Sequence, residues 1–209
     1  MNWRCLLGHE RDIAIVGSGP IDPRHGPKID QHEIVIRFNA CQNYGASGLK
    51  TDVLVLVNTG WSGKTLSRTP DAIHQGALAA AEDFWFPRHP KLINTQRRLR
   101  PIAPDAEDQD LWTDFSHELI DNHVGDRPFK YILASHYRAA QRCLEKLGST
   151  QDFEPSTGFL TLYHLRRQIR PSRVTLYGFT HEGWGGHAWA AEKALIQQWG
   201  IPYGDRPLC

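Results

Sequence analysis

The chain has 209 residues, a formal net charge of +1 and 40% hydrophobic residues. This length suits one domain with a substantial core, residues 1–209, and the balanced charge gives no electrostatic reason to expect binding to nucleic acid. No apolar run reaches the roughly 18 residues of a membrane-spanning helix, and residues 1–9 lack the apolar segment of a secretory signal. We therefore expect a single globular domain without an integral membrane span.

The first predicted element is a buried strand at residues 12–17, a short apolar run that stops at Gly17-Ser18-Gly19-Pro20. The two glycines invite a dinucleotide-binding interpretation, but that fingerprint needs a third glycine where Asp22 stands. A glycine-rich turn after a strand still lets a ligand approach the backbone closely.

Two more buried strands follow, at residues 34–38 and 52–57, and they lead into Asn39 and Asn58. Polar side chains at strand ends lie where α/β sheets collect ligands. The alternative for Asn39 is an asparagine that closes a turn. Gly63-Lys64-Thr65 imitates the end of a P-loop, but the first glycine of that motif falls on Asn58, so we reject a nucleoside triphosphatase.

The middle of the chain is predicted to hold a helix at residues 72–81, an aromatic strand at 83–87 and an amphipathic helix at 131–147. Residues 87–110 are rich in proline and arginine, which predicts a long loop or lid. Asp108-Gln109-Asp110 has the form of a metal-binding D-x-D motif, but it lies in an acidic loop and does not follow a clear strand.

Pro155-Ser156-Thr157-Gly158 predicts the start of a helix, because a Ser or Thr cap satisfies free backbone N–H groups. The open N–H groups at such a terminus form a natural seat for a phosphate. Residues 174–177 then predict a buried strand that ends at Gly178. The apolar positions between have the spacing of one buried helical face: Phe159, Leu162, Leu165 and Ile169.

Gly185-Gly186 predicts a flexible turn that leads into a helix at residues 187–199. His187 at the start of that helix is accessible to a ligand, and histidine has a pKa useful for proton transfer. The alternative is a histidine that only caps the helix.

In this order, three segments resemble the motifs of the sialyltransferases of the eukaryotic type. Residues 13–53 resemble their large motif, residues 155–179 their small motif, and His187 with Glu192 their very small motif. The resemblance implies an α/β fold, a GT-A-like Rossmann variant with a largely parallel sheet flanked by helices. It also implies an inverting glycosyltransferase that needs neither a metal ion nor a cofactor, so we discount Asp108 and Asp110 as metal ligands.

The donor implied by the resemblance is a CMP-activated 2-keto sugar acid, CMP-sialic acid or a relative such as CMP-Kdo. The implied acceptor is a hydroxyl of a glycan or glycolipid. The resemblance makes His187 the base that takes the acceptor proton, and His181 a second catalytic candidate that acts on the leaving phosphate. The donor-binding candidates are Gly17, Ser18, Asn39, Asn58, Ser156, Thr157 and Gly158.

The four cysteines are widely spaced and form no C-x-x-C pair, which argues against a metal knuckle. Animal sialyltransferases join their large and small motifs by a disulfide, and here Ile13 and Pro171 stand at those positions. Loss of that bridge fits a reducing compartment. We expect a bacterial-style enzyme in the cytoplasm or peripheral at the inner membrane.

Two alternatives stay open. One is an enzyme that only hydrolyses CMP-sugars, because 209 residues leave little room for an acceptor platform. The other is a nucleotide-binding module that kept the fold and lost the transfer reaction.

Overall fold

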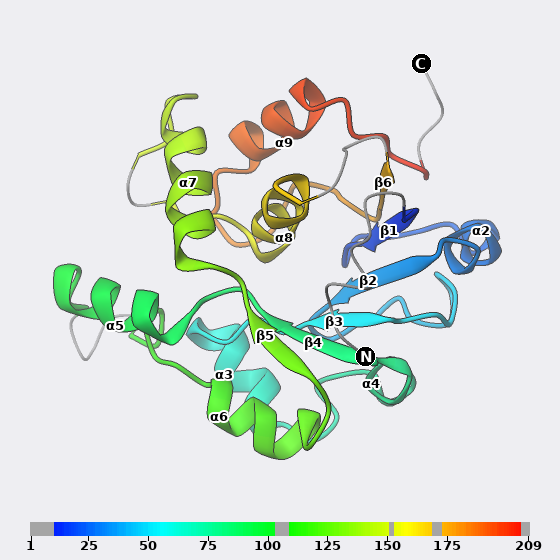
Figure 1. Ribbon diagram of the computed structural model, residues 1–209, viewed down its shortest axis with the longest axis horizontal. Helices are drawn as coiled ribbons and strands as arrows, with labels where there is room; N and C mark the ends of the chain where they lie inside the picture. The colour runs from blue at the N-terminus through cyan, green and yellow to red at the C-terminus, as the bar shows by residue number, and fades with distance from the viewer. Residues whose placement is uncertain (1–10, 103–108, 151–152, 169–172, 206–209) are drawn as a thin grey trace.

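The structure is a computed structural model that describes residues 11–102, 109–150, 153–168 and 173–205. Within these residues six strands form a parallel sheet in the order β5-β4-β3-β2-β1-β6 (Figure 1). The strands are β1 (Ile13–Val16), β2 (Ile34–Phe38), β3 (Val53–Val55), β4 (Asp83–Phe86), β5 (Phe129–Tyr131) and β6 (Val174–Tyr177).

Helices connect these strands and cover both faces of the sheet (Figure 1). They are α2 (Gly26–Asp30), α3 (Gly60–Arg68), α4 (Gln75–Ala80), α5 (Pro90–Leu99), α6 (Ser116–Leu119), α7 (Ala134–Glu145), α8 (Thr157–Arg166) and α9 (Trp189–Gln198). A 3-10 turn (Pro23–His25) precedes α2, and a π-helical turn (Ile120–Val124) continues α6. None of the helices in the described residues is long and apolar enough to cross a membrane.

The central strands are mostly apolar because both faces of the sheet are buried there. In β1, Ile13 and Ile15 join the core that contains side chains of α5, α7, α8 and α9. Ala14 and Val16 point the other way and pack with Ile29 of α2. Successive side chains of a strand alternate between faces, so a strand covered on both sides appears as an unbroken apolar run. The predicted α/β class with a parallel sheet flanked by helices is confirmed.

The predicted loop at residues 87–110 is wrong in part, because α5 occupies Pro90–Leu99. His89 caps this helix, and its Nδ1 accepts a hydrogen bond from Lys91 N at 3.1 Å. Pro90 stands at the first turn, where a missing N–H costs no helical hydrogen bond. The proline that suggested a loop is therefore a signal for the start of a helix.

The strand order reverses direction between β1 and β6. Strands β1 to β5 are added one beside the next, and the chain then returns to place β6 on the free side of β1. The helices that follow these two strands, α2 and α9, pack on opposite faces of the sheet. In open parallel sheets such a switch point is where ligands bind.

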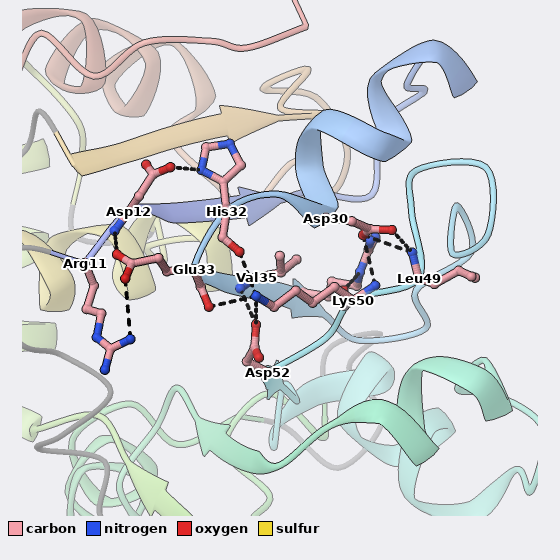
Figure 2. Close-up of polar contacts among 10 residues, drawn as sticks. Arg11, Asp12, Asp30, His32, Glu33, Val35, Leu49, Lys50 and Asp52 are labelled. Carbon is pink, nitrogen blue, oxygen red and sulfur yellow. Dashed lines mark hydrogen bonds and ion pairs between the residues drawn. The ribbon is translucent and has the colours of Figure 1, made fainter.

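Acidic residues precede three neighbouring strands at the opposite, amino-terminal edge (Figure 2). Glu33 Oε2 accepts a hydrogen bond from Asp12 N, and Asp52 Oδ2 accepts one from Val35 N, both at 2.7 Å. Lys50 Nζ donates to Glu33 O at 2.8 Å and lies 3.7 Å from Asp52 Oδ2. These contacts tie the starts of β1, β2 and β3 together.

Candidate functional site

A cavity of about 270 Å³ lies at the carboxyl ends of β1 and β6, at the switch point of the sheet. Its walls come from the turn after β1, the end of β2, the start of α8 and the segment after β6. Most of the predicted site residues line it: Gly17, Ser18, Asn39, Ser156, Thr157, Gly158, His181 and His187. We call this the first cavity.

Glycines let the ends of β1 and β6 approach closely at this cavity. Gly17 N donates to Tyr177 O at 2.8 Å, and Gly19 N donates to Gly178 O at 2.9 Å. A Cβ atom on Gly17 would lie 2.5 Å from Gly178 O, closer than a real contact allows. The glycine at this position is therefore explained by packing between the strand ends, and exposed Ser18 follows it at the cavity wall.

Asn39 has a left-handed backbone, with φ of 52°, at the end of β2. Asparagine tolerates this conformation better than most residues. Its N–H donates to Val55 O and its Oδ1 accepts from Val57 N, both at 2.9 Å. The side-chain oxygen is fixed in this way, and Nδ2 remains as a donor for a ligand in the cavity. Asn39 thus both closes a turn and lines the first cavity.

Asn58 requires a correction, because it does not line the first cavity and is fully buried. Its Nδ2 donates to Arg88 O and to Ser116 Oγ, both at 2.8 Å, and its Oδ1 accepts from Arg88 N at 3.2 Å. The amide is saturated within the protein, so direct contact with a donor sugar is not supported. Asn58 instead holds the backbone of Arg88 in place.

Helix α8 begins at the first cavity, and its cap is shared with an acidic residue from α9. Ser156 Oγ accepts from Phe159 N at 3.1 Å and donates to Glu192 Oε2 at 2.6 Å. Ser156 N donates to the other carboxylate oxygen, Oε1, at 2.7 Å. The hydroxyl expected to contact a phosphate is thus engaged internally. The N–H groups of Thr157 and Gly158 remain as the anion donors of this terminus.

Glu192 places a buried carboxyl group at this helix terminus. Burial raises the pKa of Glu192 to about 7, although the hydrogen bonds from Ser156 act in the opposite direction. Its charge therefore changes near neutral pH. An anion bound at Thr157 and Gly158 would favour the protonated form of this carboxyl group, because two nearby negative charges repel each other.

His187 lies two residues before α9 rather than within it. Its Nδ1 is 2.7 Å from Glu154 O. A carbonyl oxygen can only accept, so Nδ1 carries the proton and Nε2 is the basic nitrogen. Burial lowers the pKa of His187 to about 4, the Glu154 carbonyl opposes that shift, and the positive charge of Arg88 adds to it. The imidazole is therefore neutral at pH 7.

Two tryptophan rings enclose the imidazole of His187. The Trp184 and Trp189 rings lie edge-on to it, with centroid distances of 4.9 Å and 4.8 Å. Trp189 Nε1 donates to Trp184 O at 3.0 Å, and His187 N donates to the same oxygen at 3.2 Å. These contacts give the turn through Gly185 and Gly186 a defined conformation and fix where the imidazole points.

Glu154, whose carbonyl orients His187, is anchored by a buried cluster that sequence patterns did not indicate. Its carboxylate has no exposed surface and lies 2.7 Å from Arg100 Nη1 and 3.8 Å from Arg88 Nη2. The hydroxyl of Tyr137 also donates to it. The only local signal was the position of Glu154 directly before the predicted helix start at Pro155.

A second cavity of about 360 Å³ adjoins the first. The two share Thr157, Trp184 and His187. The other lining residues of the second cavity are Val57, Thr59, Gly60, Trp61, Ser62, Arg88 and Leu111. His187, whose Nε2 is the basic nitrogen, therefore lines both cavities. This arrangement can bring two ligands to the same imidazole.

His181 lines the first cavity from the segment that follows β6. It has a left-handed backbone, with φ of 57°, and its Nε2 lies 2.7 Å from the hydroxyl of Tyr203. The structure thus brings His181 and His187 to the walls of one cavity.

The remaining predictions concern metals and cysteines. Across the described ranges, no group of three or more His, Cys, Asp and Glu side chains could hold a metal ion. Asp110 Oδ2 pairs with Lys64 Nζ at 2.8 Å, and Asp108 lies outside those ranges. Cys41 and Cys143 are free thiols, and Ile13 is buried in β1. Cys5, Pro171, Ile169 and Cys209 lie outside the described residues.

Comparisons with known proteins give distant similarities. No family model matches the chain. The urease operon 23 kDa accessory protein of Rhizobium meliloti (strain 1021) is 27% identical over 191 residues, which cover 89% of this chain and 87% of that protein.

Two solved structures are also similar. A mammalian sialyltransferase aligns with a TM-score of 0.48 and 17% identity over 90% of this chain. The chain spans only 65% of that enzyme's length. The α-2,3-sialyltransferase from Campylobacter jejuni in its apo form aligns with a TM-score of 0.46 and 14% identity, over 94% of this chain and 74% of that one. At these values the chemistry of the chain has to be inferred from its own residues.

Proposed function

We propose that the chain is a glycosyltransferase that moves a sialic acid or a related 2-keto sugar acid, such as Kdo, from a CMP-activated donor to a hydroxyl of a glycan or glycolipid. The observation that carries this proposal is the placement of His187. Its Nδ1 is bound to Glu154 O, its Nε2 is basic, and it lines both cavities.

The first cavity suits the donor nucleotide. It lies at the switch point of the sheet, where parallel α/β folds bind nucleotides. The N–H groups of Thr157 and Gly158 at the α8 terminus supply donors and a partial positive charge for a phosphate. Asn39 Nδ2 supplies a further donor. The choice of cytidine rests on the resemblance of residues 13–53 and 155–179 to the sialyltransferase motifs.

The reaction we propose is a single displacement. The acceptor hydroxyl, held in the second cavity, attacks the anomeric carbon while the bond to the CMP phosphate breaks, and that phosphate keeps the bonding electrons. His187 Nε2 takes the hydroxyl proton, and His181 donates a hydrogen bond to the leaving phosphate. Acid–base assistance of this kind contributes roughly 10²–10⁴-fold in rate. The α8 terminus offsets the phosphate charge without a metal ion.

The lowered pKa of His187 constrains when the proton moves. A base with a pKa of about 4 is weak, so it accepts the proton late, after bond formation has made the hydroxyl acidic. The imidazolium that forms then lies near the departing phosphate. That negative charge stabilises the protonated ring and offsets the cost of its burial.

Hydrolysis of CMP-sugars is the second enzymatic candidate. Its main support is the short length of the chain, which leaves little room for an acceptor platform. The second cavity supplies such room beside His187, and this favours transfer. A binding module without transfer activity would have no use for an imidazole oriented by Glu154.

The curated relative suggests a different role. That protein is named as an accessory protein of a urease operon, and the match covers most of both chains. The corresponding candidate for this chain is a function that accompanies urease. Restoration of urease activity in a strain that lacks the relative, by the wild type and equally by His187→Ala, would favour this candidate over transfer.

The deciding experiment is a panel of CMP-sugars, monitored for CMP release with and without glycan acceptors. We expect release from CMP-sialic acid or CMP-Kdo that increases when an acceptor is added. Release that does not respond to any acceptor would indicate a hydrolase. Binding of CMP without release would indicate an inactive module, and no binding of any cytidine nucleotide would refute the proposal.

A further inference from the structure

Two residues that line the second cavity each carry a buried polar atom that lacks a hydrogen-bond partner. Arg88 is 4% exposed and Thr59 is 3% exposed, and both line this cavity. In the part of the chain that the structure describes, neither Arg88 Nε nor Thr59 Oγ1 has a hydrogen-bond partner. Buried donors of this kind are costly unless something satisfies them. The described residues provide no such partner for these two atoms.

The charge around Arg88 is incompletely balanced. Glu154 carries one negative charge but lies between two guanidinium groups, and the closer contact, at 2.7 Å, is to Arg100. Arg88 lies 3.8 Å away, longer than a charge-assisted hydrogen bond. Asp110, near the same end of α3, is paired with Lys64 at 2.8 Å. The wall of the second cavity therefore has an excess of positive charge.

The start of helix α3 adds to this charge. Thr59 is the N-cap of the nine-residue helix, yet its side chain makes no capping hydrogen bond. Gly60 N donates to Asp110 O at 2.9 Å, whereas the N–H groups of Trp61 and Ser62 belong to the open first turn. A helix terminus of this kind attracts negative charge. Thr59, the first turn of α3 and Arg88 all line the same cavity.

Aromatic surface lies beside these donors. Trp61 is 75% exposed and Trp184 is 42% exposed, and both line the second cavity. Large exposed aromatic side chains at a cavity commonly mark a binding surface, and an indole offers a flat apolar face with a polar N–H. Such a face suits the C–H face of a sugar ring.

We propose that the second cavity selects an acceptor sugar that carries an anionic group, a carboxylate or a phosphate. Arg88 and Thr59, with the α3 terminus, bind the anion, and Trp61 and Trp184 contact the sugar ring. This places a hydroxyl of the same sugar toward His187. The inference rests on the proposed transfer function and specifies its acceptor.

The first test compares acceptors with the wild-type protein. Glycans that end in a uronic acid, in a sugar phosphate or in the neutral sugar are compared under one CMP-sugar donor. We expect kcat/KM for at least one anionic acceptor to exceed that for the neutral one by about tenfold, as expected for loss of one charged hydrogen bond. The carboxylate and phosphate arms identify which anion is preferred. Equal values for all three acceptors would overturn the inference.

The second test uses matched variants, Arg88→Gln and Arg100→Gln. Each removes one guanidinium beside Glu154, but only Arg88 lines the second cavity. The readout is the ratio of kcat/KM for anionic and neutral acceptors, which a general loss of activity does not change. We expect Arg88→Gln to abolish the preference and Arg100→Gln to retain it. An unchanged ratio in Arg88→Gln, or an equal loss in both variants, would contradict the inference.

Two further measurements keep the test decisive. Thr59→Val removes the hydroxyl while preserving the shape of the side chain, and it should lower the same ratio of kcat/KM. This variant replaces Arg88→Gln in the test should Arg88→Gln not fold. Tryptophan fluorescence can report binding of glucuronate against glucose without any donor. If no CMP-sugar is cleaved, the proposed function fails, and selective glucuronate binding would still support an anion site. If CMP-sugars are cleaved but the neutral acceptor is used as well as both anionic acceptors, only the acceptor inference fails.

Discussion

Glu192 holds the start of helix α8 by accepting hydrogen bonds from Ser156 on both of its carboxylate oxygens, at 2.7 Å and 2.6 Å. The two residues are 36 positions apart and belong to different predicted motifs. A carboxyl group is tolerated in this buried position because the helix terminus supplies donors and a favourable dipole. The contact joins the α8 terminus, which we assign to the phosphate, to the helix that follows His187.

Glu192→Gln should change how stability depends on pH. Because the pKa of Glu192 is raised from 4.5 to about 7, the folded protein binds this proton more tightly than the unfolded chain does. The resulting stabilisation is complete below pH 4.5 and is lost as the pH rises through about 7. The variant should lack that loss, which amounts to about 3 kcal/mol at most. Urea unfolding of both proteins across this range measures it, and parallel profiles would contradict the assigned pKa.

His187→Ala should reduce kcat by roughly 10²–10⁴-fold and leave CMP affinity nearly unchanged, because a base acts on the transition state more than on donor binding. In the wild type, kcat/KM should fall as the pH approaches 4, where the imidazole becomes protonated and can no longer accept a proton. Steady-state kinetics and CMP titration check both effects.

His136→Ala is the control for this variant. His136 Nδ1 lies 2.9 Å from His164 Nδ1 away from both cavities, so its loss should affect stability before catalysis. Near wild-type turnover of His187→Ala with a verified acceptor would refute the proposed mechanism. A collapse of CMP binding would make His187 a donor ligand and His181 the next candidate base.

Ser156→Ala should lower the free energy of unfolding by about 1–2 kcal/mol, because it removes a helix cap and one partner of Glu192. Any loss in the free energy of CMP binding should be smaller than this loss in the free energy of unfolding. Urea unfolding and CMP titration on the same samples separate the two effects. Unchanged stability with weakened CMP binding would show that the hydroxyl contacts the phosphate directly.

Gly17→Ala should destabilise the protein by about 1–3 kcal/mol, since its Cβ would lie 2.5 Å from the backbone oxygen of Gly178. Gly185→Ala is the matched substitution, because a Cβ there has no atom within 4 Å. It should change stability by less than about 0.5 kcal/mol. Equal unfolding midpoints for the two variants would contradict the packing described at the ends of β1 and β6.

Cytidine nucleotides should bind more tightly than UDP, GDP or NADH, and activity should persist in EDTA. The nucleotide preference follows from the motif resemblance, and metal independence follows from the α8 terminus that we assign to the phosphate. Titration calorimetry and assays with EDTA measure the two properties. Equal UDP binding, or activity lost in EDTA and restored by Mn²⁺, would count against the donor site as assigned.

The sequence predicted the sheet well where burial alone decides the pattern. The strands at residues 34–38 and 174–177 match β2 and β6 at both ends, because a strand covered on both faces is a continuous apolar run. Pro90 misled the prediction, since proline marks both loops and the first turn of a helix. Periodicity could not separate these two meanings.

The contacts that orient the site could not be predicted, because they join distant segments. No local pattern links Asn58 to Arg88, or Arg88 and Arg100 to Glu154. Each pair meets only after the sheet has brought its loops together. For this reason the residues lining the first cavity were largely anticipated from motifs, whereas the buried cluster behind His187 was not.

The pairing of β1 with β6 has a consequence for how the protein folds. Val16 pairs with Tyr177 directly before the two segments that line the first cavity, so the wall of this cavity joins parts of the chain that are far apart in the sequence. Closing so long a loop costs more entropy than pairing β1 with β2, and contacts between distant residues slow folding. During synthesis β2 to β5 can assemble first while one edge of β1 stays unpaired, and such edges promote aggregation. The first cavity, which we assign to the nucleotide, should therefore be the last part of the molecule to form, and a nucleotide that binds there should improve the yield of refolding by capturing the completed sheet.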